Sequence, residues 1–205
     1  MKSRDQVRNE ILDAAVEIAA QNGITRASVG DVARRVGISR PTLYTHFASK
    51  DELVTAAIVR ESVAFVDQVT AAAAKHDEPR TALHAGIVAA LVSAREHPLL
   101  DRILRTEPEA LLPFLTSDGG PVLALAEMAI RQVIETVAPG IVAEQIRLLG
   151  DLLTRLLVSY SINAPTDSPD VIASTICSFF FDGVLADQPG VLAAQSSVDL
   201  TTEPS

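Results

Sequence analysis

The fold of this chain is decided by residues 28–53, which read SVGDVARRVGISRPTLYTHFASKDEL. The stretch predicts two short helices joined by a tight turn. Ser28 is a good N-cap for the first helix, and Gly37 ends that helix because glycine readily adopts a positive φ. Ser39 opens the second helix, and Ser49 opens a longer third helix with the Ser-x-x-Glu pattern of a capping box. This arrangement is typical of a helix-turn-helix.

The apolar residues of this stretch are spaced to form one buried seam, with the small Ala33 where the two helices cross. The seam consists of Val32, Val36, Ile38, Leu43 and Phe47. In such motifs the start of the second helix reaches base edges in the major groove of DNA. Arg40 can contact guanine O6 and N7, and Thr42 can bond a base or touch a thymine methyl group.

Other side chains of the motif are better placed for the DNA backbone, where contacts position the protein without reading sequence. Tyr44 and His46 are of this kind. The helix N-termini at Ser28 and Lys50 present free N–H groups to phosphates, and Lys50 adds a full charge. The alternative interpretation is an ordinary pair of packed helices with a glycine turn.

Residues from about 4 to 53 resemble the N-terminal domain of the TetR family of transcriptional regulators. The most specific stretches are VARRVGISRPTLYTHF, residues 32–47, and SKDEL, residues 49–53. The resemblance implies DNA contacts by Ser28, Ser39, Arg40, Pro41, Thr42, Tyr44, His46 and Lys50. Pro41 stands where glycine is frequent, which the first turn of a helix tolerates. Thr45 stands where an aromatic residue or arginine is frequent, so no contact is carried over there.

The rest of the chain also predicts helices, about nine in all, with no alternating strand pattern and no hairpin turn. The predicted fold class is therefore all-α: a three-helix helix-turn-helix domain over residues 1–48 and a C-terminal helical domain over residues 49–186. Residues 187–205 are rich in Ser and Thr and predict a flexible tail. Residues 107–109, Glu-Pro-Glu, are interpreted as a helix start rather than an acid/base pair.

Charge is unevenly distributed along the 205 residues, whose formal net charge is -9. An acidic protein ordinarily argues against nucleic acid as a partner. Residues 1–50 hold 8 Lys and Arg against 5 Asp and Glu, however, and the remainder holds 9 against 21. A net positive charge on residues 1–50 and a net negative charge on the remainder indicate that the two parts have different partners.

The C-terminal helices of TetR-like proteins bind a small ligand and form a two-fold dimer, and the resemblance implies the same here. The residues themselves show two helices, 140–162 and 168–185, that are apolar on more than one face. Such helices lie deep in a core or are shared with a partner. They fit a homodimer built through a four-helix bundle, which would place two helix-turn-helix domains against a palindromic operator. The alternative is a large monomeric core.

The expected effector is a small apolar molecule, neutral or anionic, because few charged residues interrupt the middle helices and no Trp is present to form an aromatic cage. The candidate ligand-binding residues are Phe65, Leu83, His84, Ile87, Leu111, Phe114 and Met128. The same residues are also what a plain core would contain. For His84, a hydrogen-bonded core histidine is the alternative to a pocket anchor.

Several other functions find little support in the sequence. The single cysteine, Cys177, excludes an internal disulfide and reads as a buried apolar residue rather than a redox sensor. No histidine follows a carboxylate at the Glu-x-x-His spacing of helical di-metal sites, so no metal and no cofactor are expected. No apolar run is long enough to span a membrane, and no signal peptide is seen, so a cytoplasmic location is expected.

The sequence therefore predicts a ligand-responsive DNA-binding transcriptional regulator rather than an enzyme. The expected mode is a repressor that a small apolar effector releases from its operator. The alternative is a helical-bundle protein with an enzymatic or purely structural role, in which the helix-turn-helix serves only packing.

Overall fold

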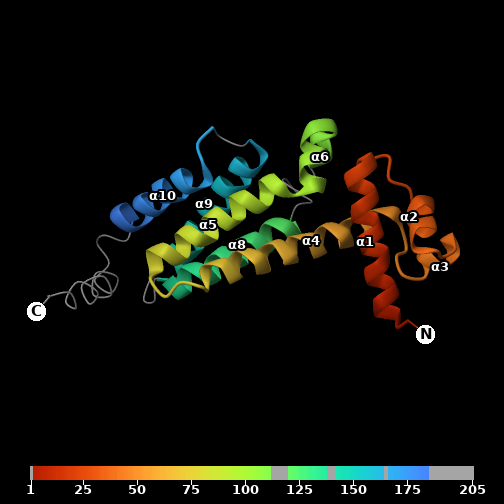
Figure 1. The fold of residues 1–205 in the computed structure, drawn as a ribbon. Coiled ribbons are helices and arrows are strands. Elements are labelled where there is room, and N and C mark those ends of the chain that lie inside the picture. The colour runs from red at the N-terminus through yellow and green to blue at the C-terminus, as the bar shows by residue number, and fades with distance from the viewer. Residues whose placement is uncertain (1, 112–119, 138–141, 164–165, 185–205) are drawn as a thin grey trace, which may run out of the picture. The chain divides into compact units, whose positions relative to one another are not determined.

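The computed structural model describes residues 2–111, 120–137, 142–163 and 166–184 (Figure 1). Every regular element in these ranges is helical, which confirms the predicted all-α class. The described ranges contain nine α-helices: α1 (Arg4–Asn22), α2 (Val29–Val36), α3 (Arg40–Tyr44), α4 (Lys50–Ala73), α5 (Pro79–Glu96), α6 (Pro98–Thr106), α8 (Gly120–Val137), α9 (Ala143–Ile162) and α10 (Pro169–Ser178). Two short elements follow α6 and α10: a 3-10 turn, η1 (Pro108–Leu111), and a π-helical turn, η2 (Phe179–Val184).

Side-chain caps and glycines mark the ends of the N-terminal helices. Ser3 caps α1 through a complete capping box with Gln6. Gly23 ends α1 at φ +89°, and Gly37 ends α2 in the left-handed region at φ +79°, ψ +30°. These two glycines are the only residues of the described ranges with positive φ. Both stops therefore depend on the backbone freedom of glycine.

The chain divides by its internal packing into two compact units. The first unit comprises residues 1–64 and 94–125, and the second comprises residues 65–93 and 126–205. The boundary predicted at residue 48 falls just before α4, whose first part belongs to the first unit. The residues of the predicted tail, 187–205, lie outside the described ranges.

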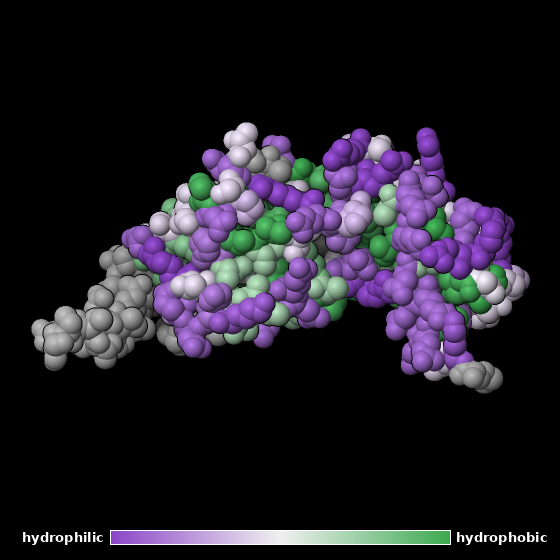
Figure 2. All heavy atoms as spheres, viewed as in Figure 1, coloured by the Kyte–Doolittle hydropathy of each residue, from purple (hydrophilic) through white to green (hydrophobic). Residues whose placement is uncertain are grey.

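The first unit has one apolar core, which is formed by side chains of α1, α2, α3, the start of α4 and α6. Ile11 of α1 and Leu43 of α3 are completely buried there. Leu99 and Ile103, one turn apart on α6, join the same core. Figure 1 shows α2 and α3 together on one side of α1, and Figure 2 shows hydrophilic side chains over the outward face of α1. The sequence placed α6 in the C-terminal domain, whereas the structure packs it on the helix-turn-helix.

The second unit has its own core, to which α5, α8, α9 and α10 contribute. Ile134 of α8 and Ala173 of α10 are completely buried, and Leu91 of α5 is 1% exposed. Phe180 and Phe181 pack edge to face, with ring centroids 5.3 Å apart and planes at 74°. This geometry is the favoured one for aromatic pairs and closes the C-terminal end of the core.

Two predicted elements differ in detail from the structure. The helix expected to start at residue 107 begins as a short 3-10 turn over residues 108–111, the last described residues before the gap at 112–119. The last helix is regular only to Ser178 and continues as η2, where the bulky Phe179, Phe180 and Phe181 follow one another. None of the described helices combines the length and apolar character needed to cross a membrane.

Candidate DNA-binding face and effector-binding unit

The turn between α2 and α3 is set by side-chain caps on both sides of Gly37. Ser28 Oγ accepts a hydrogen bond from the backbone N–H of Asp31 at 3.2 Å. Ser39 Oγ accepts one from the N–H of Thr42 at 3.1 Å, and the Ser39 and Thr42 hydroxyls lie 2.8 Å apart. These caps satisfy N–H groups that the short helices leave unpaired. The geometry is that of the predicted helix-turn-helix.

One face of the motif is buried and the other is open to solvent. Leu43 and Phe47 of the recognition segment are 0% and 1% exposed, and Val32 and Ala33 of α2 are each 2% exposed. This seam anchors α3 to α2 and α1. A five-residue helix has too few hydrogen bonds to be stable alone, so the packing of Leu43 and Phe47 determines where its outer side chains lie.

The predicted DNA contacts lie on the open face or at its edge. Five of them are exposed: Ser39, Arg40, Pro41, Thr42 and Tyr44. Ser28, His46 and Lys50 are half-buried. The Tyr44 side chain is 48% exposed, so its hydroxyl is open to a partner outside the chain. The structure thus brings all eight residues to one motif, with their backbones positioned by the buried seam.

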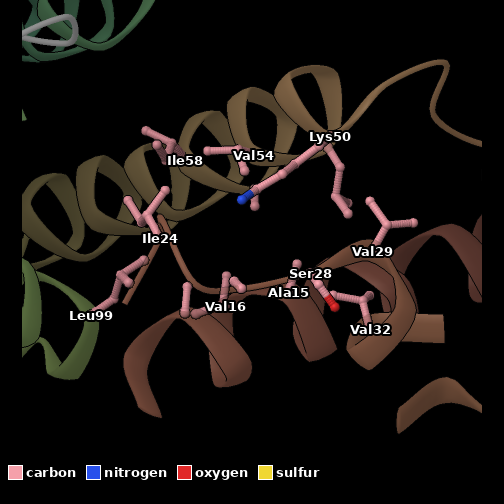
Figure 3. A pocket seen from close by; sticks show the side chains of 14 residues that line it. Ala15, Val16, Ile24, Ser28, Val29, Val32, Lys50, Val54, Ile58 and Leu99 are labelled. Atoms are coloured by element: carbon pink, nitrogen blue, oxygen red, sulfur yellow. The ribbon is translucent and has the colours of Figure 1, made fainter. Parts of the chain in front are cut away.

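Lys50 lies at the N-terminus of α4 and reaches toward the loop before α2. Its Nζ donates a hydrogen bond to the Thr25 carbonyl at 3.0 Å. Figure 3 shows the side chain extending over a small apolar cavity between α1 and α4, edged by Ile24 and Val54. The cavity holds about 30 Å³, the space of one water molecule, which is far below the size of an effector site. An ammonium has three donors, so Lys50 can keep this bond and still donate to a phosphate.

Glu107 of this unit, expected at a helix start, bonds the loop between α1 and α2. Its Oε2 accepts hydrogen bonds from both the N–H and the Oγ1 of Thr25, each at 3.0 Å. The bond from the Thr25 backbone N–H does most to hold the pKa of the Glu107 carboxyl below its usual value, and the bond from the Thr25 hydroxyl adds to this effect. Gly23 leaves the space that this carboxylate fills. Because 82 residues separate Glu107 from Thr25, no local pattern could have revealed the contact.

Two arginines of α1 hold the C-terminal end of the recognition helix. Arg8 Nη1 donates to the His46 carbonyl at 2.9 Å, and Arg4 Nη2 donates to the Thr45 carbonyl at 3.3 Å. The Arg8 guanidinium also lies 4.2 Å from the centroid of the Phe47 ring. Cations at the last carbonyls of a helix are favourable, so this pair fixes the orientation of α3. The sequence shows the arginines but not their partners.

The predicted effector residues of the second unit have mixed environments. Leu83 and Ile87 of α5 are 4% and 3% exposed and belong to its core. His84 Nε2 lies 3.2 Å from Ser174 Oγ, so this histidine has a hydrogen-bonding partner. Phe65 is half-buried, and Met128 is 59% exposed. The side chains of Leu111 and Phe114 lie outside the described residues.

An apolar groove of about 210 Å³ lies along α9, α10 and η2. Its walls are formed by Leu149, Leu152, Leu153, Leu156, Thr175, Ile176, Phe179 and Phe180. Among the predicted effector residues whose side chains the structure describes, none lines it. Two of the wall residues are exposed, Leu152 at 43% and Phe179 at 62%, and so are Leu148 of α9 at 52% and Val171 of α10 at 53%. An apolar face of this kind is typical of a surface that another molecule covers.

Cys177 is buried, as the sequence predicts, at 2% exposure. Burial raises the pKa of its thiol to about 11. Its Sγ donates a weak hydrogen bond to the Arg80 carbonyl at 3.8 Å. A thiol that stays protonated at neutral pH is a poor nucleophile, which argues against a redox sensor.

Comparison with known proteins decides the family. Residues 11–57 match the model described as "Bacterial regulatory proteins, tetR family", and residues 78–181, more than half of the chain, match "Bacterial Tetracyclin repressor, C-terminal domain". The chain belongs to the TetR family of transcriptional regulators. Members of the TetR family bind DNA and effector ligands and function as dimers. This TetR-family chain is therefore a DNA-binding transcriptional regulator and not an enzyme.

Several TetR-family relatives illustrate the range of similarity. The HTH-type transcriptional regulator AlkX of Mycobacterium tuberculosis is 26% identical over 174 residues, which cover 83% of this chain and 82% of that protein. The HTH-type transcriptional activator FasR of Mycolicibacterium smegmatis is 36% identical over 86 residues, which cover 42% of this chain and only 39% of that protein. The crystal structure of the TetR family repressor AlkX from Dietzia sp. strain DQ12-45-1b matches with a TM-score of 0.69 at 25% identity. That match covers 90% of this chain and 98% of that one.

Proposed function

We propose that this regulator is a homodimeric repressor that reads a palindromic operator with α3 and is released by a small apolar effector. The observation that carries the proposal is the exposed outer face of α3 above a completely buried Leu43. The proposed DNA contacts are Ser28, Ser39, Arg40, Pro41, Thr42, Tyr44, His46 and Lys50. Arg40 and Thr42 would read bases, and the others would position the motif on phosphates. Since its partner is DNA, we infer a cytoplasmic location.

The proposed dimer forms through the helices of residues 140–162 and 168–185. Leu148, Leu152, Val171 and Phe179 support this interface, because each is a large apolar side chain that the single chain leaves exposed. A two-fold axis would place the two helix-turn-helix domains against half-sites about 34–36 Å apart, or a multiple of that distance. Leu152→Asp and Phe179→Asp should convert the dimer to monomers in sedimentation velocity. Val63→Asp, at an exposed position of α4, is the matched control.

The proposed effector contacts of the second unit are Phe65, Leu83, His84, Ile87 and Met128. Leu111 and Phe114 are proposed as effector contacts from the sequence alone, since their side chains lie outside the described residues. An apolar effector is supported by the aliphatic character of these residues and by the relative from Dietzia, which is described as implicated in the biodegradation of n-alkanes. Effector binding would favour a dimer whose two helix-turn-helix domains no longer match the half-site spacing, so the affinity for DNA would fall. Dodecanoic acid and n-hexadecane are suitable anionic and neutral probes for release of the DNA.

The DNA-binding proposal is tested with a palindromic fragment taken from beside the protein's own gene. Arg40→Ala should weaken binding and alter base preference, whereas Lys50→Ala should weaken binding to all sequences and reduce the salt slope by about one. Arg35→Ala is the matched control, because this exposed arginine pairs with Glu17 through bonds of 3.0 and 3.1 Å. Equal affinities for the wild type, Arg40→Ala and Lys50→Ala would overturn the assignment.

A further inference from the structure

The side chain of Arg40 lies against the backbone of α2 at Gly30. Gly30 is the second residue of α2 and is buried. A methyl group added there would lie 2.7 Å from both Cζ and Nε of Arg40, and closer still to Nη2. The three atoms nearest to such a methyl group all belong to Arg40. The guanidinium therefore occupies the space that a side chain at position 30 would otherwise fill.

The charges around this contact leave the donors of Arg40 available. In the ranges that the structure describes, the Arg40 guanidinium forms no ion pair and no hydrogen bond, although the Asp31 carboxylate is close enough to feel its charge. That carboxylate is already engaged by Ser28 Oγ at 2.6 Å and by Arg34 Nη1 at 2.9 Å. The guanidinium is thus positioned by packing and by a nearby charge while its N–H groups stay free for acceptors on DNA.

The absence of a side chain at position 30 decides how far the guanidinium sits from α2. Ordinary carbon contacts begin at about 3.4 Å, so a methyl group would push the Arg40 head outward by about 1 Å. Bidentate contact with guanine requires donor–acceptor distances near 2.9 Å, and a bond stretched to 3.6 Å or more is effectively lost. A displacement of this size is therefore enough to misalign the contact.

We propose that Gly30 is a specificity-determining residue of the DNA interface that acts through Arg40. The inference rests on the proposed reading role of Arg40 and adds a residue that does not itself contact a base. Glycine is one of the least favourable residues in a helix, and alanine is the most favourable. Gly30→Ala should accordingly leave the fold at least as stable while it weakens sequence discrimination. A purely structural role for Gly30 would instead make Gly30→Ala less stable.

The test uses full-length protein and duplex DNA selected by the wild type from a random library. Affinities for the selected sequence and for each single-base variant are measured for the wild type, Gly30→Ala, Arg40→Ala and the double variant. Arg40→Ala should lose on the order of 10- to 100-fold discrimination at one base pair of each half-site. Gly30→Ala should lose discrimination at the same base pair, and the double variant should match Arg40→Ala.

The outcomes distinguish a failure of the proposed role of Gly30 from a failure of the proposed base-reading role of Arg40. If Arg40→Ala keeps every base preference of the wild type, the assignment of Arg40 as a reading residue fails. If Arg40→Ala changes the preference but Gly30→Ala does not, only the role of Gly30 fails. Losses that multiply in the double variant, or a change at a different base pair, also overturn the role of Gly30, because they show action independent of Arg40.

Discussion

Replacing Arg8 by alanine tests whether α1 holds the recognition helix in place. The substitution removes the 2.9 Å hydrogen bond to the His46 carbonyl and the cation–π contact with Phe47 at 4.2 Å. A charge-assisted hydrogen bond contributes about 1.5–3 kcal/mol, and a partly exposed cation–π contact about 0.5–1 kcal/mol. Because the Arg8 side chain is only half-buried, the lower end applies, and the expected loss is about 2 kcal/mol.

A loss of this size should lower Tm by about 4–8 °C, since about 1 kcal/mol corresponds to 2–4 °C in a chain of this length. Differential scanning calorimetry measures it, and DNA affinity should fall in parallel although Arg8 is not a proposed DNA contact. Arg35→Ala is the matched control, because its ion pair with Glu17 is exposed and such pairs contribute about 0–1 kcal/mol. If Arg8→Ala costs no more than Arg35→Ala, the anchoring role of Arg8 is refuted.

Three further predictions follow from single residues. The Glu107 carboxyl has a folded-state pKa below its unfolded value, so its bonds to Thr25 should stabilise the protein above a pH of about 4.3, and this stability should be lost as the pH falls through the folded pKa. Between pH 7 and pH 3, Tm should therefore drop more steeply for the wild type than for Glu107→Gln. Parallel curves of Tm against pH would contradict this prediction. Gly37→Ala meets open space but must adopt φ +79°, so it should cost about 1–2 kcal/mol in denaturant titration, and an unchanged midpoint would show that the turn relaxes. Cys177, whose thiol pKa is raised to about 11, should react with a thiol reagent at pH 8 only after unfolding, and rapid labelling of the native protein would disprove its burial.

The helix-turn-helix could be predicted because its signals are local. Ser28, Gly37 and Ser39 each act within a few residues, as caps or as a left-handed turn. The spacing of Leu43 and Phe47 indicates the buried seam in the same way. A signal that is complete within one helical turn needs no knowledge of the rest of the fold.

The supporting contacts could not be predicted because their partners are distant in the chain. Arg8 and the carbonyl of His46 are 38 residues apart, and Glu107 and Thr25 are 82 apart. The space at Gly30 likewise has meaning only when Arg40 of the next helix lies over it. Nothing in a helical pattern reveals which carbonyl or which surface a long side chain will reach.

The effector pocket could not be predicted from the sequence for a different reason. Apolar periodicity identifies the side of a helix that is buried, but it does not distinguish a packed core from a lined cavity. Leu83 and Ile87 are in a tightly packed cluster, and Met128, from the same pattern, is mostly exposed in the single chain. Shape is a property of several helices together, so a pocket cannot be read from one of them.

Whether two copies of this chain read DNA through α3 can be determined from the sequence that the full-length protein selects from a random duplex library. We expect a two-fold symmetric motif whose half-sites are about 10–10.5 base pairs apart, or a multiple of that spacing, with two chains bound per site. Arg40→Ala should fail to enrich the same bases. An enriched motif without two-fold symmetry, or the same motif enriched by Arg40→Ala, would refute DNA reading by two copies of α3.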